Sequence, residues 1–525
     1  MLNLTPDQRA LGRANANEVI GSTRRDFLKA AAVAPGLGAF YFGYQQMGDK
    51  PPVRAAVIGT GDEGCQAMIR YHNRAYLDFV GLCDIRPSQL ERGVKEFSAH
   101  KDYSAEDVAK LTRYQDVDAM LADPAVEMVV IALPLWLHAP VAIKAMQAGK
   151  HVFCEKLMAH DISQCKEMVK VAHEKNRLLA IGHQRHYSAL YDNANYLVQE
   201  GHLGEIRAIR ALWHRNNACP QIEKTSEGKL AYDDKGVPVY KKDKAGNVLY
   251  FDSWKKDIPQ VDEKVDFAKY GYKSVEELVR WRLFNRTGAG LMAELGSHQL
   301  DACSIFLGKK HPIAVTGIGG TFFYTDGREV DDHVFVNFEF PGKAEKDHVV
   351  VSYSSINTNA FETYGEELMG TRGTMIVEGE KEILLYKEID KNAPGKASAP
   401  KSTSVTVETR AGGKPVVEAL PSVAGPTAAA SYGAIATADP SRGYREELEH
   451  FAYCVRHGDA SNYHEDKEHR PRCRGEVALA DAVIALTSNI AMHEKRRIEF
   501  NPSWFDWQSP EVPENTSNQV ARRTS

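Results

Sequence analysis

Short apolar runs alternate with longer amphipathic segments between residues 51 and 182. The pattern predicts buried strands at 53–58, 79–83, 126–133, 151–154 and 178–182. It predicts helices between them at 65–73, 88–97, 139–148 and 162–176, the third ending at Gly149 as a helix C-cap. A regular alternation of strand and helix indicates a doubly wound parallel sheet with helices on both faces.

The hydrophobic pattern changes after residue 182. An alternating strand is expected at 204–213, further alternating strands lie between 313 and 386, and two helices follow at 444–457 and 474–495. Strands with one apolar and one polar face predict an open, mainly antiparallel sheet. The fold class is therefore α/β, an N-terminal Rossmann domain followed by an α+β domain.

Four segments are expected along the chain. They are a leader and linker at 1–50, the Rossmann domain at 51–182, a substrate and oligomerisation domain at 183–507, and a polar tail at 508–525. The second domain carries two insertions. Residues 218–280 contain a predicted hairpin at 237–251 and could form an active-site lid, a subunit contact or surface decoration, whereas residues 391–440 are rich in Ala, Ser, Thr, Pro and Gly and indicate a surface excursion.

The first predicted strand runs directly into glycines spaced as G-x-G-x-x-G. Such a loop lets the chain turn tightly, approach a pyrophosphate and pack the following helix on the strand. Asp84 ends the second strand, 20 residues after the last glycine, where an acidic residue holds the adenosine ribose. Asp84 favours NAD, because its charge would repel the 2′-phosphate of NADP, although Arg86 two residues on could accept that phosphate. The predicted phosphate loop is Gly59, Thr60, Gly61, Asp62, Glu63 and Gly64.

Charge and composition limit the partners and sites that we expect. The formal net charge is −5, so no basic face for nucleic acid is expected, and eight cysteines without a C-x-x-C pair predict neither a disulfide scaffold nor a metal site. Near the N-terminus, Arg24 and Arg25 precede a moderately apolar run at 30–44, which is the pattern of a twin-arginine leader. We expect the twin-arginine translocase as a partner, an exported or periplasmic location, and at most a weak membrane anchor.

Two more motifs fall at the expected carboxyl ends of strands. The loop Leu133-Pro134-Leu135-Trp136-Leu137-His138 follows one strand, and Glu155-Lys156 follows the next. Open α/β sheets bind ligands at this edge. Further along, residues 294, 298 and 301 are spaced i, i+4 and i+7, which would place Glu294, His298 and Asp301 on one helix face.

Taken together, these motifs resemble the Gfo/Idh/MocA family, which includes glucose-fructose oxidoreductase and inositol dehydrogenase. The resemblance covers most of residues 52–500 and rests on the glycine loop, a loop similar to T-P-N-x-x-H at 133–138, an E-K-P-like motif at 155–157, and a D-x-G-x-H-x-x-D-like motif at 294–301. The chain departs from the pattern at three places. Leu135 and Trp136 replace Asn-x, Leu157 replaces a proline that often carries a cis bond, and Glu294 replaces aspartate.

The resemblance implies roles for individual residues. Lys156 would polarise the reacting oxygen and His298 would act as general acid/base, with Glu294 and Asp301 orienting its ring. Cofactor contacts are expected from the glycine loop and from Asp84, Arg86, Leu133, Pro134, Trp136, His138, Glu155, Lys156 and Gln184. Substrate contacts are expected from Lys156, Arg185, Tyr187, His214, Arg282 and His298, with Arg215 and Trp281 near the same cleft.

Two functions fit this apparatus. The first is hydride transfer between tightly bound NAD and a hydroxyl-bearing carbon of a sugar, a polyol or a related compound. The second is an NAD-dependent glycoside hydrolase or lyase that uses transient C3 oxidation and elimination. A non-catalytic nucleotide-binding protein is less favoured because Lys156 and His298 are both present, and the resemblance implies a homodimer or homotetramer.

Overall fold

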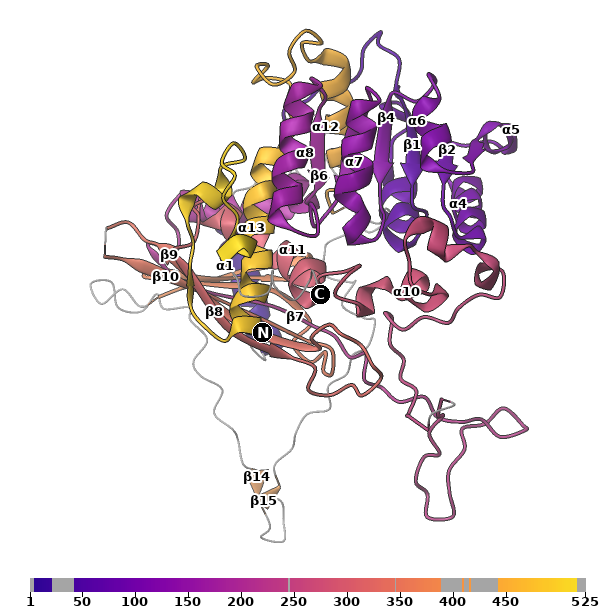
Figure 1. Cartoon of the computed structure of the whole chain (residues 1–525). Coiled ribbons are helices and arrows are strands. Elements are labelled where there is room, and N and C mark those ends of the chain that lie inside the picture. Colours follow the sequence, from indigo (N-terminus) through magenta and orange to yellow (C-terminus); the bar gives the residue numbers. More distant parts are fainter. Residues whose placement is uncertain are drawn as a thin grey trace.

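The computed structural model describes residues 4–20, 42–243, 246–344, 346–388, 408–409, 415–416 and 442–516. Arg24 and Arg25 and nearly all of the predicted excursion at 391–440 lie outside the described residues. The described part of the chain contains two large sheets, a parallel sheet at the top of Figure 1 and a larger mixed sheet below it. The predicted fold class is confirmed.

The first sheet contains six parallel strands in the order β3-β2-β1-β4-β5-β6. Its central strands are buried almost throughout, which explains why their sequences are continuous apolar runs. Because the strand order reverses between β1 and β4, a crevice forms at their carboxyl ends. The strands are β1 Val53–Ile58, β2 Leu77–Cys83, β3 Thr112–Tyr114, β4 Met128–Ile131, β5 His151–Glu155 and β6 Leu179–Gly182.

Helices connect these strands. The predicted C-cap at Gly149 is confirmed by its positive φ of 81°, which a glycine adopts at little cost. The first helix begins at Asp62 and contains a π-helical stretch, η1 Gly64–Ile69. The remaining helices of this domain are α4 Pro87–Ala99, α5 Ala105–Lys110, α6 Val117–Ala122, α7 His138–Gln147 and α8 Ile162–Glu174, with the 3-10 turn η2 Leu135–Leu137.

The second sheet has eight strands in the order β13-β12-β11-β7-β10-β9-β8-β16, and only the β7/β10 pair is parallel. One face is covered by helices that include α9 Ala189–Gln199 and α11 Ser297–Phe306. The other face exposes apolar side chains, among them Ile318, Phe335 and Val350. The strands are β7 Ile206–His214, β8 Ala314–Gly320, β9 His333–Pro341, β10 His348–Ile356, β11 Tyr364–Gly370, β12 Gly373–Glu378, β13 Glu382–Lys387 and β16 Ile498–Glu499; β14 Glu408–Thr409 and β15 Pro415–Val416 pair separately.

Described residues of the predicted leader and linker belong to the folded body. Helix α1 (Pro6–Ile20) packs on β13, where Asn15 donates a hydrogen bond to the Leu385 carbonyl at 2.9 Å. Residues 42–50 enter the core beside the parallel sheet, and the Tyr44 hydroxyl donates to Glu449 at 2.7 Å. The sequence pattern missed both contacts because they join segments hundreds of residues apart.

The two C-terminal helices return to the first domain. Helix α12 (Tyr444–His457) packs against β1, β2, β5 and β6, where Phe451 contacts Phe153. Helix α13 (Gly475–Glu494) lies between the two sheets, against α8 and β8. It is long and apolar enough to span a membrane, but 78% of its apolar window is buried in the protein, which identifies it as a core helix. The boundary predicted at residue 182 therefore does not separate two independent cores.

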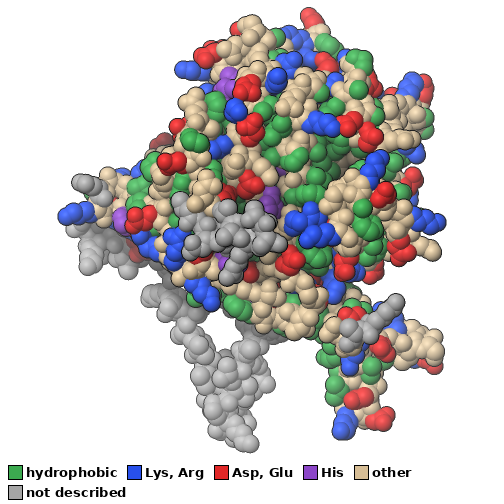
Figure 2. Space-filling view, in the orientation of Figure 1, with side chains coloured by type: hydrophobic (Ala, Val, Ile, Leu, Met, Phe, Trp, Pro, Cys, Tyr) green, Lys and Arg blue, Asp and Glu red, His purple; other side chains and the backbone are tan. Residues whose placement is uncertain are grey.

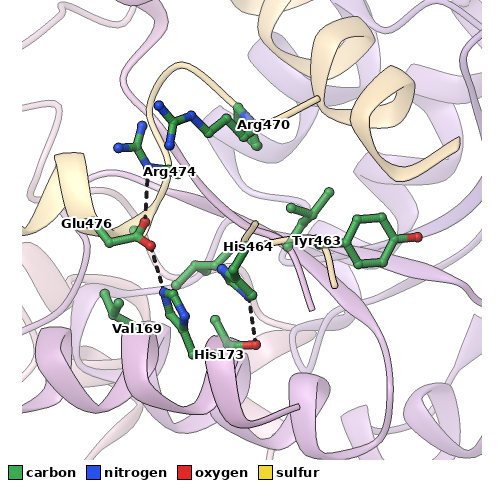
Figure 3. A pocket seen from close by; sticks show the side chains of 12 residues that line it. Val169, His173, Tyr463, His464, Arg470, Arg474 and Glu476 are labelled. Carbon is green, nitrogen blue, oxygen red and sulfur yellow. Dashed lines mark hydrogen bonds and ion pairs between the residues drawn. The ribbon is translucent and has the colours of Figure 1, made fainter. Parts of the chain in front are cut away.

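The tail predicted at 508–525 is docked as far as residue 516. Lys166 of α8 donates hydrogen bonds to the carbonyls of Ser509 and Glu511 at 2.9 and 2.6 Å. The His173 ring stacks on both Trp507 and His464. The two imidazoles lie beside Glu476 in a cavity of about 110 Å³ (Figure 3), and His173 Nε2 lies 2.8 Å from a Glu476 carboxylate oxygen.

The insertion at 218–280 divides into two parts with different positions. Residues 219–243 and 246–251 form projecting loops joined by isolated bridges, including Lys242 with Val248 inside the predicted hairpin, and they extend away from the body in Figure 1. Residues 252–286, which we call the strap, turn back toward the first domain. The strap contains η4 Asp262–Lys264, η5 Phe267–Tyr270, α10 Val275–Val279 and η6 Trp281–Leu283.

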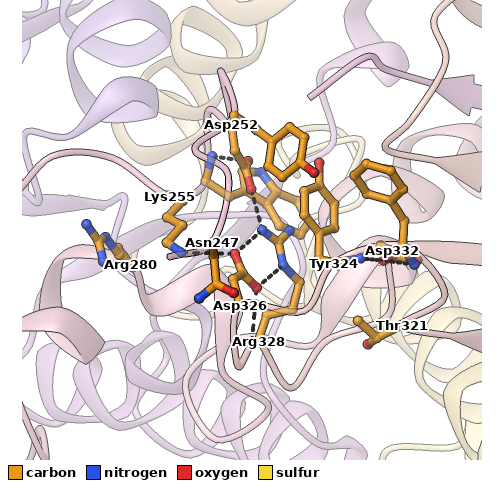
Figure 4. Close-up of polar contacts among 12 residues, drawn as sticks. Asn247, Asp252, Lys255, Arg280, Thr321, Tyr324, Asp326, Arg328 and Asp332 are labelled. Atoms are coloured by element: carbon orange, nitrogen blue, oxygen red, sulfur yellow. Dashed lines mark hydrogen bonds and ion pairs between the residues drawn. The ribbon is translucent and has the colours of Figure 1, made fainter. Parts of the chain in front are cut away.

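A buried charge network anchors the beginning of the strap (Figure 4). Arg328 donates hydrogen bonds to Asp252 and Asp326 at 2.6 and 2.7 Å, and its guanidinium lies over the Tyr324 ring. Lys255 completes the network with an ion pair to Asp326 at 3.3 Å. Breaking a buried ion pair leaves an uncompensated charge, which is costly. These contacts therefore hold the beginning of the strap against Asp326 and Arg328.

Candidate active site

A cleft of about 930 Å³ lies at the carboxyl ends of the parallel strands, between the first sheet, the strap and α11. Residues that follow each of the six strands of the parallel sheet line it, including Asp116 after β3 and Gln184 after β6. The second domain contributes residues from β7, the strap and η7 (Met292–Gly296). The cleft thus joins the two domains at the position where an open α/β sheet binds its ligands.

The three glycines of the phosphate loop occupy different environments. A Cβ on Gly59 would lie 2.3 Å from the Ala132 carbonyl oxygen, and one on Gly64 would lie 2.0 Å from the Gly59 oxygen. A Cβ on Gly61 would meet nothing within 4 Å, and Gly61 faces the cleft. Gly59 and Gly64 therefore permit close packing, while Gly61 leaves the backbone accessible to a ligand, which fits a dinucleotide pyrophosphate.

Asp84 is held in place at the end of β2. One carboxylate oxygen accepts hydrogen bonds from the Thr60 amide at 2.9 Å and the Thr60 hydroxyl at 3.3 Å, and the other accepts from the Arg86 amide at 2.9 Å. Burial raises the pKa of Asp84 above its ordinary value, against the lowering effect of these amides. Thr60 itself is buried and does not line the cleft, so it positions Asp84.

Lys156 leaves the end of β5 and reaches the second domain. Its ammonium donates a hydrogen bond to the Glu294 carbonyl oxygen at 2.9 Å. The Glu294 carboxylate accepts from Arg282 Nε at 2.6 Å. Burial acts to raise the pKa of Glu294, but the charges of Arg282 and Lys156 hold it below its ordinary value. The Lys156–Leu157 peptide bond is cis, although leucine stands where the related motif has proline.

His298 also lines the cleft, with 8% of its surface exposed. Its ring packs at 5.4 Å from the Trp213 ring, and Nδ1 has no hydrogen-bond partner among the described residues. Burial, followed by the charge of Lys156, lowers the pKa of His298 well below its ordinary value. The imidazole is therefore neutral near pH 7 and able to accept a proton.

The expected orientation of His298 by two carboxylates is wrong. Glu294 bonds to Arg282, and Asp301 bonds to His186 at 2.9 Å and to Lys309 at 2.7 Å. Asp301 itself is buried and does not line the cleft. The Lys309 ammonium, 3.6 Å from Asp481, supplies the positive charge for a buried carboxylate pair.

Glu155 presents a buried carboxyl group to the cleft beside Lys156. One oxygen accepts from the Lys156 amide at 3.2 Å and the other has no hydrogen-bond partner among the described residues. Burial, reinforced by the charge of Glu63, raises the pKa of Glu155. This group thus favours its neutral form more than an exposed glutamate does.

The strap contacts the first domain at three points around the cleft. Lys256 forms an ion pair with Asp62 of the phosphate loop. Tyr272 packs edge-to-face on Trp136 at 5.2 Å. Asp262 binds Arg86 beyond the end of β2. The strap therefore follows the cleft from the glycine loop to the turn after β2.

Most residues expected in the site do line the cleft. These are Gly59, Gly61, Asp62, Glu63, Asp84, Arg86, Leu133, Pro134, His138, Glu155, Lys156, Gln184, Arg282, Glu294 and His298. The ring nitrogens of His138 lie 2.8 Å from the Leu157 oxygen and 2.9 Å from the Leu133 oxygen, so this residue ties the two loops together.

Three predicted substrate residues and three predicted cofactor residues, Thr60, Gly64 and Trp136, do not line the cleft. Arg185 is buried against Glu366 and donates to the His298 carbonyl at 2.6 Å. The Tyr187 hydroxyl lies 2.6 Å from His450 in the core, and His214 bonds to Ser354. Trp136 packs under the strap. Each of these four side chains contacts a partner outside the cleft, whereas a neighbouring residue of the same motif lines the cleft.

Other cleft residues were not assigned a role from the sequence. They are aromatic and basic side chains, chiefly from the strap and from the return of the chain after residue 441. Aromatic clusters in the sequence, such as Tyr270-Gly271-Tyr272, could have indicated them. The insertion is long, however, and its sequence does not show which part returns to the cleft. They are Trp213, Trp254, Lys256, Tyr270, Tyr272, Arg280, Arg442 and Tyr444, whereas Arg215 and Trp281, which were expected near the cleft, line it as well.

Comparisons with known proteins agree with this geometry. Residues 53–183 match the oxidoreductase family model described as an NAD-binding Rossmann fold, and residues 265–376 match the GFO/IDH/MocA C-terminal domain. The chain is 24% identical over 334 residues to an uncharacterized oxidoreductase, C115.03, of Schizosaccharomyces pombe, covering 62% of this chain and 71% of that protein. It is 26% identical over 175 residues to inositol 2-dehydrogenase of Salmonella typhimurium, covering 33% of this chain and 48% of the relative.

Solved structures of oxidoreductases share this fold. Aldose-aldose oxidoreductase from Caulobacter crescentus, solved in complex with glycerol, superposes with a TM-score of 0.53 at 18% identity, over 86% of this chain and 100% of that one. The fold and the cleft define an oxidoreductase built on an NAD-binding domain. Both domains match models of the Gfo/Idh/MocA oxidoreductase family.

Proposed function

We propose that this protein transfers a hydride between tightly held NAD and a hydroxyl-bearing carbon of a sugar, a polyol or a related compound. The observation that carries the proposal is the placement of Lys156 and His298 in one cleft with the glycine loop and Asp84. Basic and aromatic side chains, including Arg215 and Trp281, line the same cleft and suit a polyhydroxylated substrate.

The residues present fit a nicotinamide dinucleotide. Gly61 leaves room for a pyrophosphate, Asp84 presents a carboxylate for ribose hydroxyls, and Glu155 and Gln184 border the inner end of the cleft. A bound nicotinamide would supply the hydride acceptor or donor. Positioning the substrate carbon against it is the task of the side chains that surround the inner end of the cleft.

Lys156 and His298 divide the proton chemistry. The Lys156 ammonium has three N–H donors and uses one on the Glu294 carbonyl, so it can donate another to the reacting oxygen. His298 is neutral and can take the hydroxyl proton as the carbon loses its hydride; in the reverse direction it returns that proton. Arg282 neutralises Glu294 and keeps its carboxylate from competing for the Lys156 ammonium.

Retention of the cofactor between turnovers is supported by the strap. Its contacts with Asp62, Trp136 and Arg86 lie around the predicted dinucleotide position, so release requires these contacts to open. A retained cofactor would have to be reoxidised in place, by a second substrate or by the product of the first.

The experiment is to denature the purified protein, identify the released nucleotide by mass, and assay sugars, polyols and aryl glycosides without added cofactor. A change at 340 nm with a free sugar or polyol supports the oxidoreductase. Release of the aryl group would instead support the glycoside-cleaving alternative. Protein that emerges empty and turns over only with added NAD would contradict cofactor retention.

Export through the twin-arginine route remains a proposal that depends on Arg24 and Arg25. Cleavage anywhere in residues 21–41 would leave residues 42–50 in the core but would remove α1, which packs on β13. Replacing both arginines by lysine and fractionating the cells tests the route.

Acidic and basic side chains intermingle over the face in Figure 2, and we propose no nucleic-acid partner.

We also propose a homo-oligomer formed through the open face of the second sheet. Ile318, Phe335 and Val350 expose 68%, 48% and 44% of their surface there. The molar mass of the protein in solution, measured by light scattering, tests this, with Phe335→Glu as the disrupting variant.

A further inference from the structure

Asp262 of the strap lies against the adenosine end of the cleft and is completely buried. One carboxylate oxygen accepts hydrogen bonds from Arg86 Nε at 3.0 Å and from the Ser88 hydroxyl at 2.5 Å. The other oxygen accepts from the Ser88 amide at 3.0 Å. The contact spans 176 positions of sequence and joins the strap to the turn between β2 and α4.

Arg86 is the side chain at this turn that is placed to receive an additional phosphate. It lines the cleft two residues after Asp84, and arginine at this position of a Rossmann domain accommodates the 2′-phosphate of NADP. In this structure its charge is already paired with Asp262, and 15% of its side chain remains exposed. A 2′-phosphate would therefore meet the carboxylates of Asp84 and Asp262 where the charge of Arg86 is already paired.

We propose that Asp262 excludes NADP from this site by occupying Arg86, so that the cofactor selectivity of the first domain is set by a residue of the second. The inference deepens the proposed function and depends on it, because it assumes that the cleft binds a nicotinamide dinucleotide. Asp84 attracts the ribose hydroxyls of NAD, whereas Asp262 removes the cation that NADP needs. Selectivity of this kind uses an element directed against the competing ligand.

The same contact would also be expected if Asp262 merely fastened the strap. The two roles predict different results for its removal. A fastener affects both nucleotides alike because it acts on the opening of the cleft, whereas an excluding charge changes the ratio of NADP to NAD bound. Asp262→Asn tests this, since the amide keeps an acceptor for the Ser88 amide and loses the charge.

The experiment incubates each protein with equal concentrations of NAD and NADP, removes free nucleotide by gel filtration, and quantifies what denaturation releases. We expect the parent to retain NAD, and Asp262→Asn to raise the ratio of NADP to NAD by about tenfold or more. Adding Arg86→Ala to Asp262→Asn should abolish this gain, because the freed guanidinium is the group that receives the phosphate. Glu263→Gln is the matched control, since it removes an exposed carboxylate one residue away and should leave the ratio unchanged.

An unchanged ratio in folded Asp262→Asn would overturn the inference while leaving the proposed function intact. A parent protein that retains neither nucleotide, and shows no NAD binding by titration, would overturn both. Thermal melting checks that each variant is folded. If the asparagine variant does not fold, Asp262→Ser retains an acceptor without the charge and is subject to the same criterion.

Discussion

The Lys156 ammonium donates a hydrogen bond to the carbonyl oxygen of Glu294 at 2.9 Å. This contact joins the end of β5 in the first domain to the π-helical turn before α11 in the second. Because His298 follows on α11 and also faces the cleft, the two proposed reacting groups are positioned by one connection between domains. A shift of either domain would separate the lysine from the histidine and disable both.

Replacing Lys156 or His298 by alanine should lower turnover by about 100-fold or more, as expected for a lost general acid/base or polarising group. The double variant should lose less than the product of the two single losses, because the residues act together. His214→Ala is the control, since this histidine bonds to Ser354 outside the cleft. Steady-state kinetics with the identified substrate decide the matter, and a His214 variant as impaired as the His298 variant would contradict the assignment.

The pH dependence should reflect the lowered pKa of His298. Burial and the Lys156 charge disfavour the imidazolium, so the neutral base persists to a lower pH than for an exposed histidine. In the oxidative direction kcat/KM should therefore stay level as pH falls through about 6.5 and decline only below it. A Lys156→Met variant that retains measurable activity should show this decline at higher pH, because one source of the shift is gone.

Asp84→Ala should weaken NAD binding by about 1.5–3 kcal/mol, the range for a hydrogen bond to a charged group. The variant should also discriminate less against NADP, since a carboxylate beside the 2′ position is removed. Isothermal titration with both nucleotides measures this. Unchanged NAD affinity would mean that the ribose lies elsewhere and that Asp84 serves only to bind Thr60 and Arg86.

Arg185 is expected to act on stability. Its guanidinium is 2% exposed and pairs with Glu366 at 2.8 Å, so Arg185→Leu should leave a buried carboxylate unpaired and cost about 3–5 kcal/mol. Arg207→Leu, which breaks an exposed pair with Glu205, should cost less than about 1 kcal/mol. Urea unfolding of both variants makes the comparison, and equal midpoints would contradict it.

Local pattern was sufficient for five of the six strands of the first domain and for its motifs, but it missed the short strand β3. Apolar runs and glycines identified the strands, the phosphate loop and Asp84, because each depends on neighbours close in sequence. The strap and the docking of residues 42–50 could not be predicted, since Asp262 with Arg86 and Tyr44 with Glu449 join distant segments. Arg185 and Tyr187 were misassigned because a polar side chain near a motif has the same sequence signature whether it faces the cleft or a buried partner.

The rate of nucleotide release should depend on Trp136, which does not line the cleft. Its ring packs against Tyr272 at 5.2 Å and under the Arg286 guanidinium at 4.7 Å, and both partners belong to the strap. An aromatic pair and a cation–π contact are together worth about 1–2.5 kcal/mol, so Trp136→Ala should speed release by about tenfold. Trp507→Ala, which removes a tryptophan stacked on His173 away from the cleft, should leave the rate unchanged. Loss of labelled NAD during a chase with excess unlabelled NAD gives both rates. Equal rates for the Trp136 variant and the parent would mean that the strap does not control release, and that any retention of the cofactor arises from contacts within the cleft itself.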